Sequence, residues 1–266
     1  MADAEQRWAD ELAAWEIPRE ILEAAPESPW GFPPALFARG APEPAALQGA
    51  ASPSRRHAAE VLEEEASVLD VGSGGGAASL ALVPPAGMLV AVDQSEELLQ
   101  AFSEAADRLA VAHREVRGTW PGVAEEVDAA DVVVCHHVLY NTAELVAFTS
   151  ALTDHARHRV VVELTARHPQ VELNHLWREL HGIDRPSGPT AEDACAVLTE
   201  AGLDVHAEEW ERPSLWSGID RSELVAFARR RLCVGPERDA EIDALLYPDR
   251  ERPMRPMVTL WWEGEA

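Results

Sequence analysis

The chain has 266 residues, of which 47% are apolar, and it carries a formal net charge of −25. This length and apolar content suffice for one large domain, or for one domain with a cap. A chain this negative repels nucleic acid and anionic membranes, so neither is expected as a partner.

The N-terminal residues 4–25 are predicted to form one or two helices. Apolar residues recur there at about helical spacing, at Trp8, Leu12 and Trp15. Pro18 suits the first turn of a second helix, because its missing amide hydrogen needs no partner there.

The next segment, residues 26–51, is rich in Pro, Gly and Ala, which predicts a loop. Ser52-Pro53 then predicts the start of a helix that runs to about Glu65, with the serine as its N-cap. We therefore interpret residues 1–51 as a helical extension. It either packs on the main domain as a fixed flap or closes over a ligand as a lid.

A glycine-rich turn follows the first predicted strand. The apolar residues 68–71 lead into Gly72-Ser73-Gly74-Gly75-Gly76, and a helix is expected from Ala77. The next strand, residues 88–92, ends in Asp93, whose carboxylate can accept hydrogen bonds from both hydroxyls of a ribose. Strand, glycine turn and helix is the arrangement that holds a nucleotide-like ligand at the carboxyl edge of a parallel sheet.

The spacing Asp70-x-Gly72-x-Gly74-x-Gly76, with Asp93 at the end of the next strand, resembles the cofactor site of class I S-adenosylmethionine (SAM) dependent methyltransferases. The same turn also satisfies the dinucleotide fingerprint, as Gly72-x-Gly74-x-x-Ala77. Two features favour the methyltransferase. An acidic residue stands two positions before the first glycine, where dehydrogenases usually have an apolar residue, and the motif lies more than sixty residues into the chain.

The resemblance implies SAM as the methyl donor and S-adenosylhomocysteine as the product. It implies cofactor contacts from Asp70, Gly72, Ser73, Gly74, Gly76, Asp93, Gln94, Thr119, Trp120, Cys135 and His136. The carboxylate that the family often places beside the adenine is missing after the third strand, where Thr119 and Trp120 stand. Two interpretations of Trp120 remain open, stacking on the adenine or packing against a helix.

Strands and helices alternate as far as residue 164. We predict helices at 96–109 and 142–156 and strands at 113–118, 131–135 and 159–164. This alternation predicts a parallel sheet with right-handed crossovers. The resemblance implies an α/β fold with a doubly wound, Rossmann-like and mostly parallel seven-stranded sheet, closed by an antiparallel pair at 203–210 and 257–262.

The rest of the chain contains more helices than closing a sheet requires. We predict an amphipathic helix at 171–181, a helix from a capping box at Thr190 to Gly202, and two helices within 220–246. Residues 52–266 are therefore interpreted as a methyltransferase domain with helical cap insertions at about 170–190 and 213–250.

Two adjacent histidines follow the fourth predicted strand. The neutral imidazole of His136 or of His137 can take a proton near neutral pH, so each is a candidate base. Adjacent residues of an extended chain point to opposite sides, so at most one is expected to face the pocket. The alternative is that either histidine lines the cofactor or fills space. No metal site is expected, since the consecutive residues Cys135, His136 and His137 cannot easily converge on one ion.

Polar and aromatic residues near this edge and in the cap are candidates for binding the methyl acceptor. They are Tyr140, Asn141, His175, Trp177, His181 and Arg185, with Trp216 as a further flat apolar surface. Each has a structural alternative, because Trp and His on helix faces often pack.

The three cysteines are scattered and indicate no disulfide framework, and the first residues lack the features of a signal peptide. No apolar run has the length of a membrane span. We therefore expect a cytoplasmic enzyme, monomeric or homodimeric, that methylates a small molecule. The alternative is a protein that binds SAM or NAD(P) without methyl transfer, as a regulator or a reductase.

Overall fold

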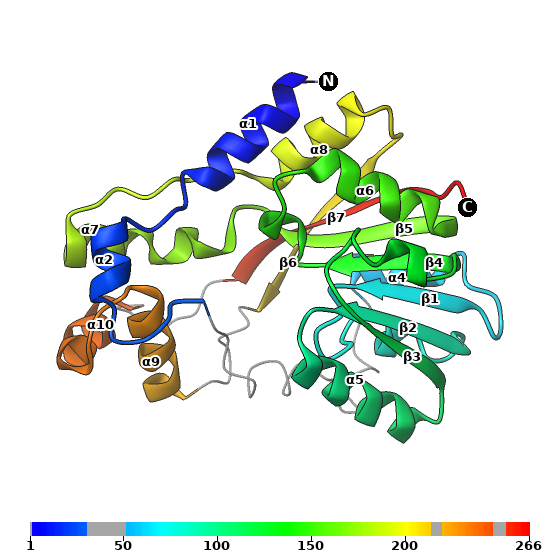
Figure 1. The fold of residues 1–266 in the computed structure, drawn as a ribbon, viewed down its shortest axis with the longest axis horizontal. Coiled ribbons are helices and arrows are strands. Elements are labelled where there is room, and N and C mark those ends of the chain that lie inside the picture. The colour runs from blue at the N-terminus through cyan, green and yellow to red at the C-terminus, as the bar shows by residue number, and fades with distance from the viewer. Residues whose placement is uncertain (1, 31–51, 214–219, 247–253) are drawn as a thin grey trace.

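The computed structural model describes residues 2–30, 52–213, 220–246 and 254–266 (Figure 1). The α-helices are α1 (Ala2–Ala13), α2 (Arg19–Ala24), α4 (Pro53–Ala59), α5 (Glu96–Leu109), α6 (Leu145–Asp154), α7 (Asn174–His181), α8 (Ala191–Glu200), α9 (Arg221–Arg231) and α10 (Asp239–Leu245). The 3-10 helices are η2 (Leu80–Leu82), η3 (Ala124–Glu126), η4 (Leu139–Asn141), η5 (Pro169–Leu173) and η6 (Pro236–Arg238). The strands are β1 (Ser67–Val71), β2 (Met88–Asp93), β3 (Ala112–Arg117), β4 (Ala130–His136), β5 (Ala156–Thr165), β6 (His206–Pro213) and β7 (Met254–Glu263). Within these ranges, no helix is both long and apolar enough to cross a bilayer.

The seven strands form one sheet in the order β3-β2-β1-β4-β5-β7-β6. Strands β1 to β5 pair in parallel, while β7 runs antiparallel to both β5 and β6. This confirms the predicted doubly wound, mostly parallel sheet and the antiparallel strands that close it. The strand order reverses between β1 and β4, and ligands of open α/β sheets bind at the carboxyl ends of the strands beside such a switch point.

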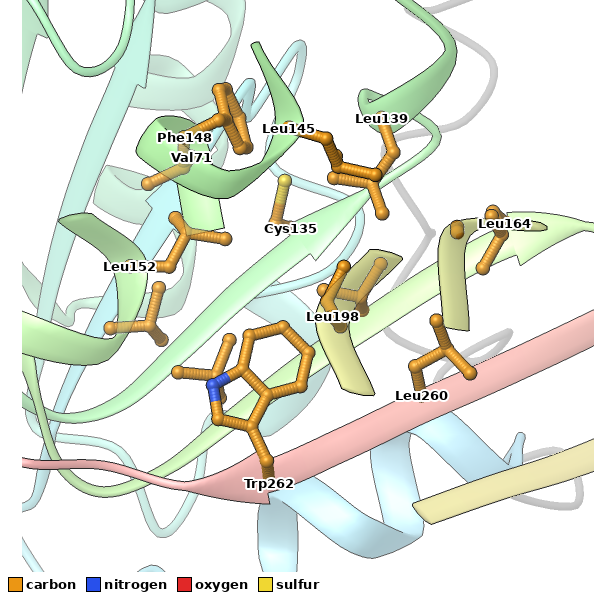
Figure 2. Packing of buried hydrophobic residues seen from close by; sticks show 14 of the residues in the cluster. Val71, Cys135, Leu139, Leu145, Phe148, Leu152, Leu164, Leu198, Leu260 and Trp262 are labelled. Carbon is orange, nitrogen blue, oxygen red and sulfur yellow. The ribbon is translucent and has the colours of Figure 1, made fainter. Parts of the chain in front are cut away.

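Helices cover both faces of the sheet. On one face, α6, α8 and α1 pack on alternate residues of the central strands, among them Val133 and Cys135 of β4. Figure 2 shows Trp262 of β7 and the thiol of Cys135 inside this core. On the other face, α4, α5 and η2 cover Val132 and Val134. Burial on both faces explains why the sequence of β4 is an unbroken apolar run.

Helix α1 is anchored in the main core. The side chain of Trp8 is only 1% exposed, and its indole Nε1 donates to the carbonyl of Thr142 at 2.8 Å. A carboxylate oxygen of Glu5 accepts from the amide of Val146 in the first turn of α6, at 2.8 Å. These contacts favour the fixed flap over the lid for residues 2–13. Of the rest of the extension, residues 14–30 are described and contain α2, while residues 31–51 lie outside the described residues.

Helices α2, α7, α9 and α10 form a separate apolar cluster, which we call the cap cluster. Its most buried members include Ile17, Leu176, Trp177, Leu224, Leu232 and Ile242. In Figure 1 strand β5 ends on the side of this cluster, and β7 starts there. The described parts of the segments 170–190 and 213–250 therefore contribute helices to one unit on the side where β5 ends. Residues 214–219 and 247–250 are not described.

Several local predictions were wrong. Residues 77–87, all of them described, contain turns and the short η2 instead of an α-helix. One reason is that the amide and hydroxyl of Ser79 bond the Asp70 carboxylate instead of helix carbonyls. Helix α4 ends at Ala59 and does not reach Glu65, because consecutive glutamates oppose the negative end of the helix dipole.

Smaller differences concern two boundaries. Pro18 is the N-cap of α2 and does not lie in its first turn. Strand β6 begins at His206, three residues after the predicted start. The predicted capping box is confirmed, since Thr190 and Asp193 bond each other's backbone amides at the start of α8.

Candidate functional site

The glycine turn after β1 requires glycine at two positions, because each has a positive φ and a close neighbour. Gly72 has φ +70°, and a Cβ atom there would lie 2.3 Å from Cγ2 of Val138, in the loop after β4. Gly76 has φ +82°, and a Cβ atom there would meet the ring of Phe102 at 2.4 Å. At these two positions the turn is packed between the end of β4 and helix α5, with no room for a side chain.

Asp93 closes β2 directly beside this turn. One carboxylate oxygen accepts from the amide of Gly74 at 2.9 Å, and the other accepts from the amide of Ser95 at 2.8 Å. The side chain is half-buried. Because each carboxylate oxygen has two lone pairs, both keep an acceptor site for a further donor. Asp93 therefore fits the two hydroxyls of a ribose.

Asp70, by contrast, is 1% exposed and holds the turn from within. Its Oδ2 accepts from the hydroxyl of Ser79 at 2.6 Å and from the amide of the same residue at 3.2 Å. Burial raises the pKa of Asp70 to about 6, although the two hydrogen bonds from Ser79 oppose the shift. This position suits a residue that shapes the glycine turn better than one that touches the ligand.

The raised pKa of Asp70 predicts a pH dependence of stability. The unfolded chain releases this proton near pH 4 and the folded chain near pH 6, so the free energy of unfolding falls as pH rises between these values. The contribution is about 3 kcal/mol, at about 1.4 kcal/mol per pKa unit. We expect Asp70→Asn to lack this decrease when urea unfolding is measured from pH 4 to pH 7. The exposed Asp204→Asn is the control, and an identical pH dependence of the parent and Asp70→Asn would contradict the assignment.

Four further cofactor candidates lie along the same edge. Gln94 and Thr119 are exposed at the ends of β2 and β3. The indole Nε1 of Trp120 donates to the carbonyl of Phe148 at 3.3 Å, and the ring meets His155 edge-on. This contact with α6 favours packing over adenine stacking. Cys135 is fully buried, and burial raises the pKa of its thiol well above the ordinary value. Its side chain belongs to the main core and is not available to a ligand.

The two histidines after β4 have different surroundings. Burial lowers the pKa of His136 to about 4, so this imidazole is neutral near pH 7. His137 adopts a left-handed backbone with φ +63°, which turns the chain out of the strand. Its side chain is 38% exposed, and its Nε2 lies 3.3 Å from Oε1 of Glu163. His137 is therefore the accessible imidazole of the pair. Among the described residues, no cluster of His, Cys, Asp or Glu side chains is arranged to hold a metal ion.

Glu163 had not been singled out from the sequence. It lies in the apolar run of β5, directly opposite His136 in the parallel register. Its side chain is 5% exposed and also lies near Ser54 and Arg212. The one available signal was an acidic residue inside an otherwise apolar buried strand.

The acceptor candidates are dispersed and mostly make structural contacts. The hydroxyl of Tyr140 donates to the carbonyl of Thr165 at 2.7 Å. The imidazole Nε2 atoms of His181 and His175 lie 2.7 and 3.2 Å from the backbone carbonyls of Leu232 and Leu245. These contacts hold β4 against β5 and join α7 to the helices that follow it.

Trp177 belongs to the cap cluster, and Arg185 lies at the border of this cluster. The indole of Trp177 is 1% exposed, and the guanidinium of Arg185 stacks between it and Trp15. Arg185 also donates to the carbonyl of Glu16 at 2.9 Å. Asn141 is exposed in η4 and remains open to a ligand, while Trp216 lies outside the described residues.

Comparisons with known proteins agree with this geometry. A family model described as a methyltransferase domain matches residues 69–162. No curated protein sequence gave a match to the chain.

Three solved structures have a similar fold. The YcgJ protein of Bacillus subtilis is 16% identical, with a TM-score of 0.53, over 80% of this chain and 99% of that one. A proposed methyltransferase of Bacillus halodurans is 16% identical, with a TM-score of 0.53, over 80% of this chain and 97% of that one. A proposed sarcosine dimethylglycine methyltransferase of Galdieria sulphuraria is 14% identical, with a TM-score of 0.52, over 79% and 83%.

At these identities the structural similarity establishes the fold, which is the Rossmann-like sheet of class I methyltransferases. The family model places a methyltransferase domain at residues 69–162, inside this fold.

Proposed function

We propose that the protein transfers a methyl group from SAM to a small-molecule acceptor held between the carboxyl edge of the sheet and the cap cluster. The observation that carries the proposal is the placement of the cap cluster on the side where β5 ends. A helical unit with its own apolar core lies beyond the end of β5, and an acceptor bound between the two would be enclosed as a small molecule is and a large polymer is not. The net charge of −25 also disfavours nucleic acid as the acceptor.

Two features would hold the cofactor. The Asp93 carboxylate would accept from the ribose hydroxyls, while the glycine turn at Gly72 and Gly74 would lie against the methionine portion. When bound, SAM supplies a methyl group made electrophilic by its sulfonium. The protein then has to position the acceptor, exclude water and take up a proton where the nucleophile carries one.

The short η2 after the glycine turn disfavours the alternative dinucleotide ligand. A dinucleotide places its pyrophosphate at the N-terminus of the α-helix after the turn, where free amides and the helix dipole stabilise the charge. Residues 77–87 form turns and a three-residue 3-10 helix instead. SAM has no phosphate and needs no such helix.

Removing the Asp93 carboxylate tests the cofactor site. Asp93→Ala loses two charge-assisted hydrogen bonds to the ribose, so we expect SAM affinity to fall by about 2–4 kcal/mol. Titration calorimetry with SAM and S-adenosylhomocysteine measures the effect, and NAD(P) should give no binding heat with the parent. The exposed Asp204→Ala should bind as the parent does. Unchanged SAM affinity of Asp93→Ala would defeat the assignment.

The acceptor class is tested with SAM carrying a radiolabelled methyl group. Phenols, catechols, amines and thiols with an aromatic portion form the small-molecule set, and tRNA and duplex DNA form the polymer set. We expect label in the small molecules alone. Robust labelling of tRNA or DNA without any small-molecule product would overturn the proposed function.

A further inference from the structure

We infer that Glu163 is a positioning residue that holds His137 as the base of the reaction. The inference rests on the proposed function, because a base is needed only if an acceptor gives up a proton. Glu163 is a buried carboxylate in a strand whose other buried side chains are mostly apolar.

Glu163 is surrounded by donors from three directions. From α4, the hydroxyl of Ser54 donates to Oε2 at 2.7 Å, and from β6 the guanidinium of Arg212 donates to Oε1 at 3.1 Å. From the end of β4, Nε2 of His137 lies 3.3 Å from Oε1, and Nδ1 of His136 lies 4.0 Å from Oε2. These are the titratable and charged groups of the described residues that face the carboxylate at short range.

This arrangement keeps Glu163 ionised. Burial alone would raise its pKa, but the hydrogen bonds from His137 and Ser54, with the guanidinium of Arg212 at 3.1 Å, hold the pKa well below the ordinary value. A buried carboxylate destabilises a protein unless it is paired, and an apolar residue would fill the same place in β5 without that requirement. The charge therefore calls for a role beyond packing.

The backbone places His137 for such a role. Its amide donates to the carbonyl of Glu163 at 2.7 Å, and its left-handed φ turns the chain outward at that point. The imidazole thus has one edge against a buried carboxylate while the side chain stays 38% exposed. An outlier backbone fixed by a neighbouring strand is typical of a functional position.

The protonation states follow from this contact. An ionised carboxylate oxygen can only accept, so the hydrogen of the neutral imidazole lies on Nε2 and the lone pair lies on Nδ1. As the acceptor nucleophile forms its bond to the methyl carbon, the bond from that carbon to sulfur breaks. The nucleophile's proton passes to Nδ1 of His137. The resulting imidazolium is paired with Glu163 and later releases the proton to water.

His136 is a poor candidate for the same task. Its pKa of about 4 leaves too little basicity near pH 7, and its Nε2 is buried with no hydrogen-bond partner among the described residues. Its side chain is 19% exposed beside Glu163, so we assign it to the wall of the site.

The test compares Glu163→Gln, which removes the charge, with Glu163→Asp, which keeps it. Glu263→Gln, exposed near the opposite end of the sheet, is the matched control. With the best acceptor found among the labelled small molecules, we expect Glu163→Gln to lower kcat by about 10–100-fold. Acceptor KM and S-adenosylhomocysteine affinity should stay within about threefold of the parent. Glu163→Asp should recover most of the loss in kcat.

The split between kcat and KM, together with rescue by Glu163→Asp, provides the readout that a purely structural role would not give. A carboxylate that only stabilised the fold would change the binding of both ligands as well, whereas one that orients the base changes kcat alone. The affinity of Glu163→Gln for S-adenosylhomocysteine, measured by calorimetry, needs no acceptor and no turnover.

The outcomes separate the inference from the proposed function. A parent enzyme that labels a polymer and no small molecule contradicts the proposed function, and the same comparison of kcat is then made with that polymer. Parent-like kcat of Glu163→Gln, or equal losses of kcat in Glu163→Gln and Glu163→Asp, would overturn the inference. If Glu163→Gln does not fold, a loss of kcat in Glu163→Asp as large as that of His137→Ala would overturn it equally.

Discussion

Replacement of His137 by alanine is expected to lower kcat by about 10²–10⁴-fold, which is the usual contribution of a positioned base. The affinity for SAM should remain within about threefold, because the proposed cofactor contacts run through Asp93 and the glycine turn instead. Steady-state kinetics with a labelled acceptor and calorimetry with SAM measure the two quantities separately. His158→Ala, at an exposed histidine near the opposite end of the sheet, is the matched control.

Near-normal turnover of His137→Ala would show that the acceptor reacts without a base from this position. The acceptor would then be a nucleophile that is already unprotonated near neutral pH, and the site would act by positioning alone. That result would contradict the role of His137 while leaving the SAM site and the fold unaffected.

Replacement of Trp8 by alanine is expected to destabilise the protein by about 3–5 kcal/mol, as large-to-small changes of buried aromatic residues do. The indole is 1% exposed, stacks on the ring of Tyr140 at 5.5 Å and donates to the carbonyl of Thr142. Truncation would leave a cavity between α1 and η4 and an unpaired carbonyl. The free energy of unfolding in urea measures the loss.

The chain offers a matched control in Trp30, which is 55% exposed. Trp30→Ala should change the free energy of unfolding by less than about 0.5 kcal/mol. A small effect of Trp8→Ala would show that α1 detaches readily, which is the lid alternative. The expected large effect would place α1 in the cooperative core. This agrees with the hydrogen bonds that join Trp8 to Thr142 and Glu5 to Val146.

Local pattern alone determined the framework of this protein. Strands β1, β4 and β5 are short apolar runs, the glycine turn is contiguous, and Asp93 follows its strand at once. Helix α5 was predicted at its observed bounds because the apolar face that indicates it is local, and the structure adds an N-cap serine, Ser95, directly before it. Features encoded within about fifteen residues need no knowledge of the fold, and the parallel topology then follows from the alternation of strands and helices.

The tertiary structure decided which side chains face ligand and which face core. Trp177 and Tyr140 suit a pocket by composition, but helices and strands distant in sequence bury both of them. The local pattern marks Glu163 only as an acidic residue in an apolar strand. Its proposed role depends on Ser54, Arg212 and His137, which three other parts of the chain supply. Burial, ionisation and the tautomer of an imidazole are set by the atoms around a side chain. Where those atoms come from remote segments, only the folded chain determines them.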